Sequence, residues 1–405
     1  MAAPLLVRNR NYRLLFIAGT LTNFGDGLIV LALPWLATLM TREPIAIAAV
    51  AAAARLPWLL FALPAGVIID RTDRRKLIAR ADMLRAGIVL SIMMLALSQP
   101  VPEMIWALVG LAFLLGSAEV LRDNAAQTIL PGIVAPEDLE AANGQMWSAE
   151  QLTGQFIGPP LAGLLIGAGI ALPFGLDAAA LVLAAGLVWL ITLPPQLRTS
   201  SRFWPALLEG VRWMRRDVPL LRLAVVLGLV NFLYMMATTI TILFAQEVLG
   251  LSAVGQGVLM SVAAMGAVVG SLGAQTVIAR VGAQASLFVS LAIWGVTYAA
   301  IGLSSSTMIV GAAMFSLMAG SMLWNIITVS WRQRRIPAEL LGRVNSIYRF
   351  FGWGSMPLGA IAGGIVVQLV ENEVGREAAL RAPFLLAAAG SGALLVYAVF
   401  KLRLR

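Results

Sequence analysis

The stretch Gly66-Val-Ile-Ile-Asp70-Arg71-Thr-Asp73-Arg74-Arg75-Lys76 separates two long apolar segments, residues 45–69 and 77–98. A helix needs about 20 apolar residues to cross the hydrocarbon core of a bilayer. Each flanking segment is long enough, and Arg and Lys concentrate in cytoplasmic connections. The stretch therefore predicts two membrane helices that are joined by a short cytoplasmic loop.

The same alternation of apolar segments and connections continues along the whole chain. Apolar spans are predicted at residues 14–40, 45–69, 77–98, 104–121, 146–169, 171–193, 221–245, 255–279, 285–303, 307–329, 344–370 and 382–400. These spans are continuous and rich in Leu and Ala, which favours helices over the alternating strands of a membrane barrel. We therefore predict an all-α membrane protein with twelve transmembrane helices.

The basic residues predict the orientation of the spans in the membrane. Of the 29 Arg and Lys residues, all but Arg42, Arg55, Arg376 and Arg381 fall on the same side as the first loop. Both termini are therefore expected in the cytoplasm, in a multi-pass protein of the cell (inner or plasma) membrane. The first apolar run is too long for a signal peptide and is expected to remain as a helix.

The composition excludes several classes of function. The chain is 60% hydrophobic and 12% charged, whereas soluble proteins carry about 25% charged residues. The net charge of +9 is explained by cytoplasmic loops that attract anionic lipid headgroups, so we expect no nucleic-acid binding. The chain has no Cys and no His, which excludes disulfides, thiolate catalysis and the usual zinc sites. We expect no metal, no other cofactor and no enzyme activity, and any proton coupling must use carboxylates.

The two halves of the chain share short motifs in the same order. Pro136-Glu-Asp-Leu139 corresponds to Pro337-Ala-Glu-Leu340, Pro160-Leu-Ala-Gly163 to Pro357-Leu-Gly-Ala360, and Asn23-Phe24 to Asn231-Phe232. These echoes indicate a duplicated six-helix unit with a substrate path between the copies. The predicted domains are residues 1–193, a cytoplasmic linker at 194–220, and residues 221–405. The linker contains either an amphipathic helix on the lipid surface or a plain solvated segment.

The first loop also has a recognisable spacing, Gly, three residues, Asp-Arg, two residues, Arg-Arg. This spacing resembles the loop signature of the major facilitator superfamily, except that Asp73 stands where the general pattern has Gly. The resemblance implies the major facilitator fold, with twelve helices in two six-helix pseudo-repeats. It also implies a gating role for the loop residues Gly66, Asp70, Arg71, Arg74 and Arg75. The alternative is that the cations only anchor the loop.

The fifth span carries Gly154-Gln-Phe-Ile-Gly158-Pro159-Pro160-Leu-Ala162-Gly163. Small residues four apart permit close helix contact, and Pro bends a helix because it lacks a backbone donor. The motif resembles the Gly-Pro signature of antiporters in the same superfamily, with Ala162 in place of one Gly. That resemblance implies a hinge at Gly154, Gly158, Pro159 and Gly163 and favours export over uptake. Ordinary helix packing is the alternative.

Four further segments are similar to one branch of the superfamily. They are Arg8-Asn-Arg-Asn-Tyr-Arg13, Asn23-Phe-Gly-Asp26, Leu176-Asp-Ala178 and Leu341-Gly-Arg-Val344. The branch includes macrolide-efflux proteins and the enterobactin exporter. The resemblance implies a small-molecule substrate, and we expect the chain to act as a monomer.

Ionisable residues inside a membrane are costly and are functional candidates by default. Asp26 lies near the middle of the first span and Arg55 near the middle of the second. We predict that Asp26 carries the coupling proton or meets a cationic substrate and that Arg55 is its partner. A static ion pair is the alternative. Asn23 and Asn231 occupy equivalent places in the two halves and are predicted to line the substrate path.

Other charged residues are weaker candidates. Asp177 is predicted to be an interfacial helix residue or an external gate. Glu119 and Arg122 are three apart in the fourth span and are expected to pair with each other. The fourth span has no Arg at its middle, so the proton relay of many drug–proton antiporters is not carried over to this chain.

The chain lacks a phosphate-binding Gly-x-x-x-x-Gly-Lys-Ser/Thr loop, so ATP is not the expected energy source. The predicted function is that of a secondary active transporter, a proton-coupled exporter of lipophilic or amphipathic molecules by alternating access. Multidrug efflux by an antiporter fits this description. The alternative is an exporter of a specific metabolite such as a siderophore.

Overall fold

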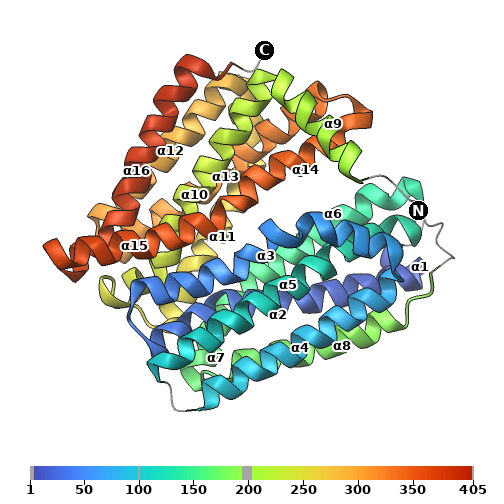
Figure 1. Cartoon of the computed structure of the whole chain (residues 1–405), viewed down its shortest axis with the longest axis horizontal. Coiled ribbons are helices and arrows are strands. Elements are labelled where there is room, and N and C mark those ends of the chain that lie inside the picture. Colours follow the sequence, from blue (N-terminus) through green and yellow to red (C-terminus); the bar gives the residue numbers. More distant parts are fainter. Residues whose placement is uncertain (1–3, 99–100, 194–202, 404–405) are drawn as a thin grey trace. The chain divides into compact units, whose positions relative to one another are not determined.

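The computed structural model describes residues 4–98, 101–193 and 203–403. Within these ranges, side chains are not described at 62–63, 66–68, 70–71, 203–207, 338–339 and 341–342. All regular elements in the described ranges are helical, as Figure 1 shows. The predicted all-α class is confirmed.

The elements of the first half follow the predicted spans closely. They are α1 (Leu5–Arg8), α2 (Arg10–Met40), α3 (Pro44–Arg71), α4 (Arg74–Leu97), α5 (Ile105–Ile129), α6 (Leu139–Glu150), α7 (Gly158–Ala168) and α8 (Leu172–Trp189). Three 3-10 turns lie at Pro102–Met104, Leu130–Gly132 and Pro136–Asp138, and a π-helix at Gln151–Ile157 joins α6 to α7.

The second half begins with α9 (Phe203–Arg216), which lies in the predicted linker. The long helices that follow are α10 (Val218–Glu247), α11 (Ala253–Val281), α12 (Ala283–Leu303), α13 (Thr307–Arg335), α14 (Ala338–Gly354), α15 (Met356–Val374) and α16 (Arg376–Lys401). Residues 194–202, at the start of the predicted linker, lie outside the described residues.

Ten segments of the described residues are long and apolar enough to cross a membrane. The predicted spans 77–98 and 146–169 are not among them. The first corresponds to α4, which carries Asp82 and Arg85 in addition to its basic first turns. The second is divided into α6, the π-helix and α7, none of which is long enough alone. Charged residues in the first span and changes of helix type in the second, rather than a lack of helix, explain the two differences.

Contacts divide the chain into two units. Unit 1 consists of Met1–Thr41, Ala53–Ser201 and Ser252–Ser261. Inside it, α8 packs against both α2 and α4, α4 packs against α5, and α2 packs against α7. Figure 1 shows that α4 and α8 lie side by side. Its apolar core includes Leu15, Ile69, Ile78, Val120 and Val188, each at most 2% exposed.

Unit 2 consists of Arg42–Ala52, Arg202–Leu251 and Val262–Arg405. Inside it, α16 packs against α12 and α10, α12 packs against α13, and α10 packs against α15. The linker helix α9 packs against α14, where Glu209 forms an ion pair with Arg343. A helix is therefore present in the predicted linker, and its amphipathic character and its position on the lipid surface stay predictions.

Candidate functional site

A series of alternating acidic and basic side chains runs through the interior of unit 1. Arg85 on α4 forms an ion pair with Asp26 on α2. Arg85 Nη1 also lies 3.7 Å from Asp82 Oδ1, and Arg122 Nε on α5 lies 3.5 Å from the same oxygen. Arg122 Nη1 in turn lies 3.2 Å from Asp123 Oδ1. We call these five residues, in the order Asp26, Arg85, Asp82, Arg122 and Asp123, the ion chain.

The ion chain is buried at its centre and accessible at both ends. The side chains of Arg85, Asp82 and Arg122 are 1%, 0% and 8% exposed, whereas those of Asp26 and Asp123 are 36% and 32% exposed. Its three carboxylates outnumber its two guanidinium groups when all are ionised. Because an uncompensated charge is expensive in a low-dielectric interior, this surplus favours the binding of one proton or one cation. Asp26 is an accessible place for it.

A further carboxyl group lies beside Asp26. The Asp177 side chain on α8 is 0% exposed and lies so close to Gly25 that a Cβ atom there would overlap its carboxyl group. Among the described residues, neither carboxyl oxygen of Asp177 has a hydrogen-bond partner. The sequence expectation of an interfacial Asp177 is therefore wrong, since the packing of α8 against α2 and α4 covers it completely.

The structure also corrects the predicted partner of Asp26. The prediction that Arg55 pairs with Asp26 is wrong, because the ion pair of Asp26 is made by Arg85. Arg55 lies on α3, half-buried, and its charge acts on Glu119 of α5. Arg55 was predicted to be the partner of Asp26 because the two residues lie on neighbouring spans in the sequence. In the structure α8 packs against both α2 and α4 and so brings their buried faces together.

The predicted pair of Glu119 and Arg122 is also wrong. Arg122 contacts Asp82 and Asp123, and its Nη2 donates a 2.6 Å hydrogen bond to the Thr22 hydroxyl of α2. Sequence reasoning counted Arg85 among the cations of the cytoplasmic end and did not consider Asp82. The i,i+3 spacing of these two opposite charges within an apolar helix is the signal that could have identified them.

The two predicted asparagines lie in different units. Asn231 Nδ2 on α10 donates a 3.0 Å hydrogen bond to the Gly352 carbonyl of α14. Asn23 is half-buried on α2, and its carbonyl oxygen would lie 3.1 Å from a Cβ atom at Gly154. The Asn231 amide thus holds two helices together, and a role of either residue in the substrate path stays a prediction.

The loop motif that was predicted to be cytoplasmic is partly described. Gly66, Asp70 and Arg71 lie in the last turns of α3, but their side chains lie outside the described residues. Arg74 Nη1 donates to the Thr128 carbonyl at 2.9 Å, and Arg75 Nη1 donates to the Ile191 carbonyl at 3.1 Å. These bonds tie the start of α4 to the ends of α5 and α8.

The departure from the family pattern at Asp73 has a structural reason. The Asp73 side chain accepts a 3.2 Å hydrogen bond from the Lys76 N–H and so caps the first turn of α4. An Asp at the N-cap satisfies a backbone donor that glycine would leave free. The loop therefore gains a defined helix start where the general pattern has a flexible residue.

The predicted hinge begins in the π-helix at Gly154 and continues into α7 with Gly158, Pro159 and Gly163, and it makes close backbone contacts. A Cβ atom at Gly158 would lie 2.6 Å from Gly27 Cα, and one at Gly27 would lie 2.5 Å from the Gly154 carbonyl oxygen. A Cβ atom at Gly163 would lie 2.5 Å from the Ala253 carbonyl oxygen. Because π-turns are rare and occur mostly at functional positions, the π-helix gives the motif a feature beyond ordinary packing. The hinge itself stays a prediction.

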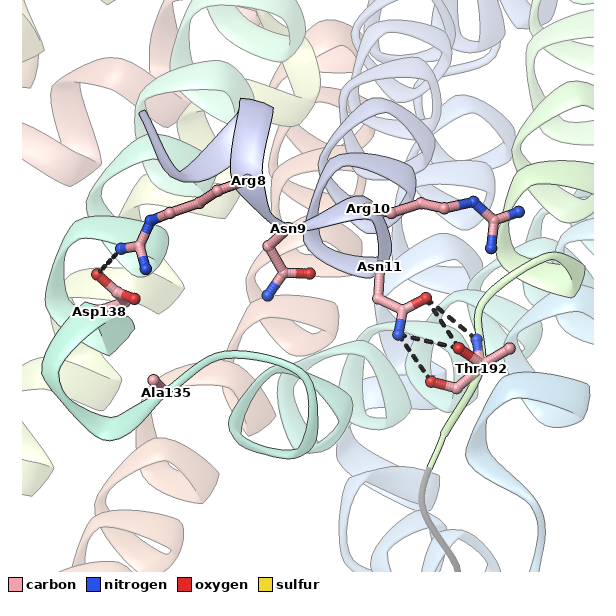
Figure 2. Close-up of a pocket in the computed structure, with 7 residues that line it drawn as sticks. All are labelled: Arg8, Asn9, Arg10, Asn11, Ala135, Asp138 and Thr192. Atoms are coloured by element: carbon pink, nitrogen blue, oxygen red, sulfur yellow. Dashed lines mark hydrogen bonds and ion pairs between the residues drawn. The ribbon is translucent and has the colours of Figure 1, made fainter. Parts of the chain in front are cut away.

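The N-terminal motif lines a polar pocket of about 360 Å³ in unit 1 (Figure 2). Arg8 forms an ion pair with Asp138 just before α6. Asn9 caps α2 by accepting from the Tyr12 N–H, and its Nδ2 donates to the Ile133 carbonyl at 2.7 Å. Asn11 faces Thr192 and donates to its carbonyl at 2.9 Å. The motif therefore fastens the start of α2 to the segments around α6 and after α8.

The described residues contain no group of three or more acidic side chains placed to hold a metal ion. The residues assembled in unit 1 can bind and release protons and can attract a cation at Asp26.

The match to a known protein family covers nearly the whole chain. Residues 2–405 match the family described as transmembrane secretion effector, of the major facilitator superfamily. Macrolide efflux protein A of Enterococcus faecalis is 26% identical over 187 residues, 44% of this chain and 56% of that protein. The multidrug efflux pump Tap of Mycobacterium bovis is 31% identical over 166 residues, 38% of this chain and 37% of that pump. The chain thus aligns with about half or less of the length of these two relatives.

Longer matches carry less functional information. An uncharacterised MFS-type transporter of Sinorhizobium fredii, y4rN, is 27% identical over 369 residues, 87% of each chain. Among solved structures, a point mutant of the nucleoside transporter NupG matches with a TM-score of 0.76 at 15% identity, over 97% of this chain and all of that one. A bacterial homologue of the iron transporter ferroportin, in an inward-facing state, matches with a TM-score of 0.73 at 18% identity, over the same shares. At these identities the structures indicate the fold alone.

Proposed function

Because the chain belongs to the transmembrane secretion effector family of the major facilitator superfamily, we propose that it is a proton-coupled exporter of lipophilic or amphipathic small molecules. It is a multi-pass membrane transporter and not an enzyme. The observation that carries the proposal is the ion chain of unit 1, which has one carboxylate more than it has cations and ends at the accessible Asp26. The efflux relatives favour export over uptake.

The proposal includes twelve membrane crossings in two six-helix pseudo-repeats. In α4 the charges of Asp82 and Arg85 are buried, while Met83, Leu84, Leu90, Met94 and Leu97 are exposed. A helix with paired charges inside and apolar residues outside can cross a bilayer. The span made of α6, the π-helix and α7 is continuous in helical backbone.

Equivalent contacts in the two units support the repeat. The pairs α2–α8, α4–α8 and α4–α5 of unit 1 correspond to α10–α16, α12–α16 and α12–α13 of unit 2. In unit 1, Gly163 lies against the first residues of α11 at Ala253; in unit 2, Gly364 lies against the first residues of α3 at Pro44. Both glycines lie inside their helices and allow the same kind of backbone approach.

We further propose that transport proceeds by alternating access of the two repeats, in a monomer of the cell membrane with both termini in the cytoplasm. The chain has no Cys, so single-cysteine variants can be labelled without background. Arg8→Cys and Lys401→Cys should react with an impermeant thiol reagent only in everted vesicles. Arg42→Cys should react in whole cells. Labelling of Arg8→Cys and Lys401→Cys on opposite faces would refute this topology.

Proton coupling is tested in everted vesicles supplied with lipophilic dyes and drugs in the outer medium, with and without a pH gradient. Wild-type accumulation should follow the gradient. Asp26→Asn should lose that dependence, because the accessible carboxylate of the ion chain can no longer bind a proton. Glu140→Gln, which changes an exposed acid of the same unit, should leave it intact. Transport by Asp26→Asn with unchanged pH dependence would rule out the role of Asp26.

The second candidate function is export of a specific anionic metabolite such as a siderophore. The same assay tests it. Arg55 provides the observation that favours it, since this half-buried guanidinium makes no hydrogen bond or ion pair within the described part of the chain. Failure with every lipophilic cation, together with success with an anionic catechol, would favour this candidate.

A further inference from the structure

Asp177 differs from every other buried acid of unit 1 for which contacts are described. Asp82 is equally buried, but two guanidinium groups lie within 4 Å of its Oδ1 atom, at 3.5 and 3.7 Å. Asp177 has no ion pair and no hydrogen-bond partner among the described residues, although its side chain is 0% exposed. An isolated buried carboxylate is so unfavourable that such a group normally binds a proton and becomes neutral.

The surroundings of Asp177 contain the charged groups that a proton exchange needs. Helix α8 packs against α2, α4 and α7. The charged groups that act on it electrostatically are Asp26 of α2 and Arg85 and Asp82 of α4, whereas α7 carries no ionisable residue. Glu119 of α5 also acts on it. The positive charge of Arg85 thus acts on two carboxyl groups, that of Asp26, with which it forms an ion pair, and that of Asp177.

The position of Asp177 against α2 is fixed by a glycine. The carboxyl group occupies the space that a side chain at Gly25 would need, and Gly25 is followed directly by Asp26. The absence of a Cβ atom therefore lets the Asp177 carboxyl group reach the backbone beside Asp26. No larger residue at position 25 would permit this approach.

We propose that Asp177 is a second proton-binding site, a buried store that exchanges its proton with Asp26 while Arg85 moves between them. In the first form of this exchange Asp177 is the neutral acid, and Asp26 is the carboxylate paired with Arg85. In the exchanged form the O–H bond of Asp177 is broken and one is formed on Asp26, and Arg85 pairs with the new carboxylate of Asp177. Charge and proton number are unchanged by this step. The neutral Asp26, which is 36% exposed, then releases the proton to water.

This inference deepens the proposed function, on whose proton coupling it rests, and infrared spectroscopy of the purified protein tests it without transport. A protonated carboxyl group has a C=O stretching band that is separate from the amide bands and shifts in D₂O. At neutral pH the wild type should show this band, and Asp177→Asn should lose it. Asp26→Asn should also lose it, because Arg85 without its partner would draw Asp177 into the ionised form. Glu140→Gln, which changes an exposed acid of the same unit outside the ion chain, should retain it.

Two results would overturn the inference. A band that persists in Asp177→Asn assigns the proton to another group, and a band that is lost in Asp177→Asn but persists in Asp26→Asn refutes the exchange of Arg85. Asp177→Ser serves as a second variant if Asp177→Asn does not elute as a folded protein in size-exclusion chromatography. The transport assay of Asp26→Asn described above tests the proposed function separately. Proton-coupled transport can be refuted by that assay while the infrared band still depends on Asp177.

Discussion

The Ser261 hydroxyl on α11 donates a 2.9 Å hydrogen bond to the Phe156 carbonyl, within the π-helix that precedes Pro159 and Pro160. In an unbroken α-helix the N–H of residue 160 would bond to this carbonyl, but proline has no N–H. A side chain from a helix distant in sequence therefore satisfies an acceptor that the Gly-Pro motif leaves open. The contact belongs to unit 1, which includes Ser252–Ser261.

Loss of this hydrogen bond should destabilise unit 1. Ser261→Ala is expected to cost about 1 kcal/mol, the usual contribution of one such bond, and to lower the midpoint of thermal unfolding in detergent. Ser91→Ala is the matched control, because the Ser91 hydroxyl bonds only to the Gly87 carbonyl of its own helix and is exposed. Equal shifts for the two variants would contradict the role given to Ser261.

The close approach of the predicted hinge to α2 should not tolerate a methyl group. In Gly158→Ala the new Cβ atom would lie 2.6 Å from Gly27 Cα and 3.0 Å from the Thr153 carbonyl oxygen, both backbone atoms that cannot rotate away. We expect strongly reduced transport and a lower unfolding midpoint. Gly167→Ala in the same helix, with no atom within 4 Å of the new Cβ, should behave like the wild type. Normal transport by Gly158→Ala would show that the π-helix tolerates displacement.

Removal of Arg85, one of the two buried cations of the ion chain, should be more harmful than removal of a surface cation. Arg85→Gln leaves Asp26 without its partner and Asp82 with one guanidinium. Breaking a buried pair in this way costs about 3–5 kcal/mol, so the yield of folded protein should fall. Arg80→Gln changes an exposed cation of the same helix and should have little effect. Similar yields for both variants would mean that the ion chain contributes nothing to folding.

The contact between Gly25 and Asp177 is tested by a double-mutant cycle. Gly25→Ala alone should be destabilising, because the new Cβ atom overlaps the Asp177 carboxyl group. Asp177→Ala removes that group, so the double variant should recover most of the lost unfolding midpoint, a non-additivity expected of residues in contact. Gly19→Ala on the same helix, whose nearest neighbour is Met146 Cε at 3.8 Å, should be neutral or stabilising by about 1 kcal/mol. Additive effects at positions 25 and 177 would refute the contact.

The sequence was sufficient to identify the ten described segments that are long and apolar enough to cross a membrane, since length and apolar composition act locally. The helices α2, α10, α13 and α16 were predicted by these properties alone, and the family resemblance was carried by short motifs whose spacing is also local. Asp73 illustrates the limit. Its departure from the family pattern was visible in the sequence, but only the structure assigned it as the N-cap of α4.

The partners of the buried charges were decided by tertiary structure. Asp26 and Arg55 lie on the consecutive helices α2 and α3, which suggested an ion pair between them. The observed ion pair joins Asp26 to Arg85, because α2 and α4 both pack against α8. Asp177 was predicted from the sequence to be an interfacial residue or an external gate, and the structure shows its side chain completely covered. Hydropathy determines which segments enter the lipid, because each residue's transfer from water is nearly independent of the fold. It cannot determine which helix faces which, because that choice depends on side chains that are distant in sequence and adjacent only after packing.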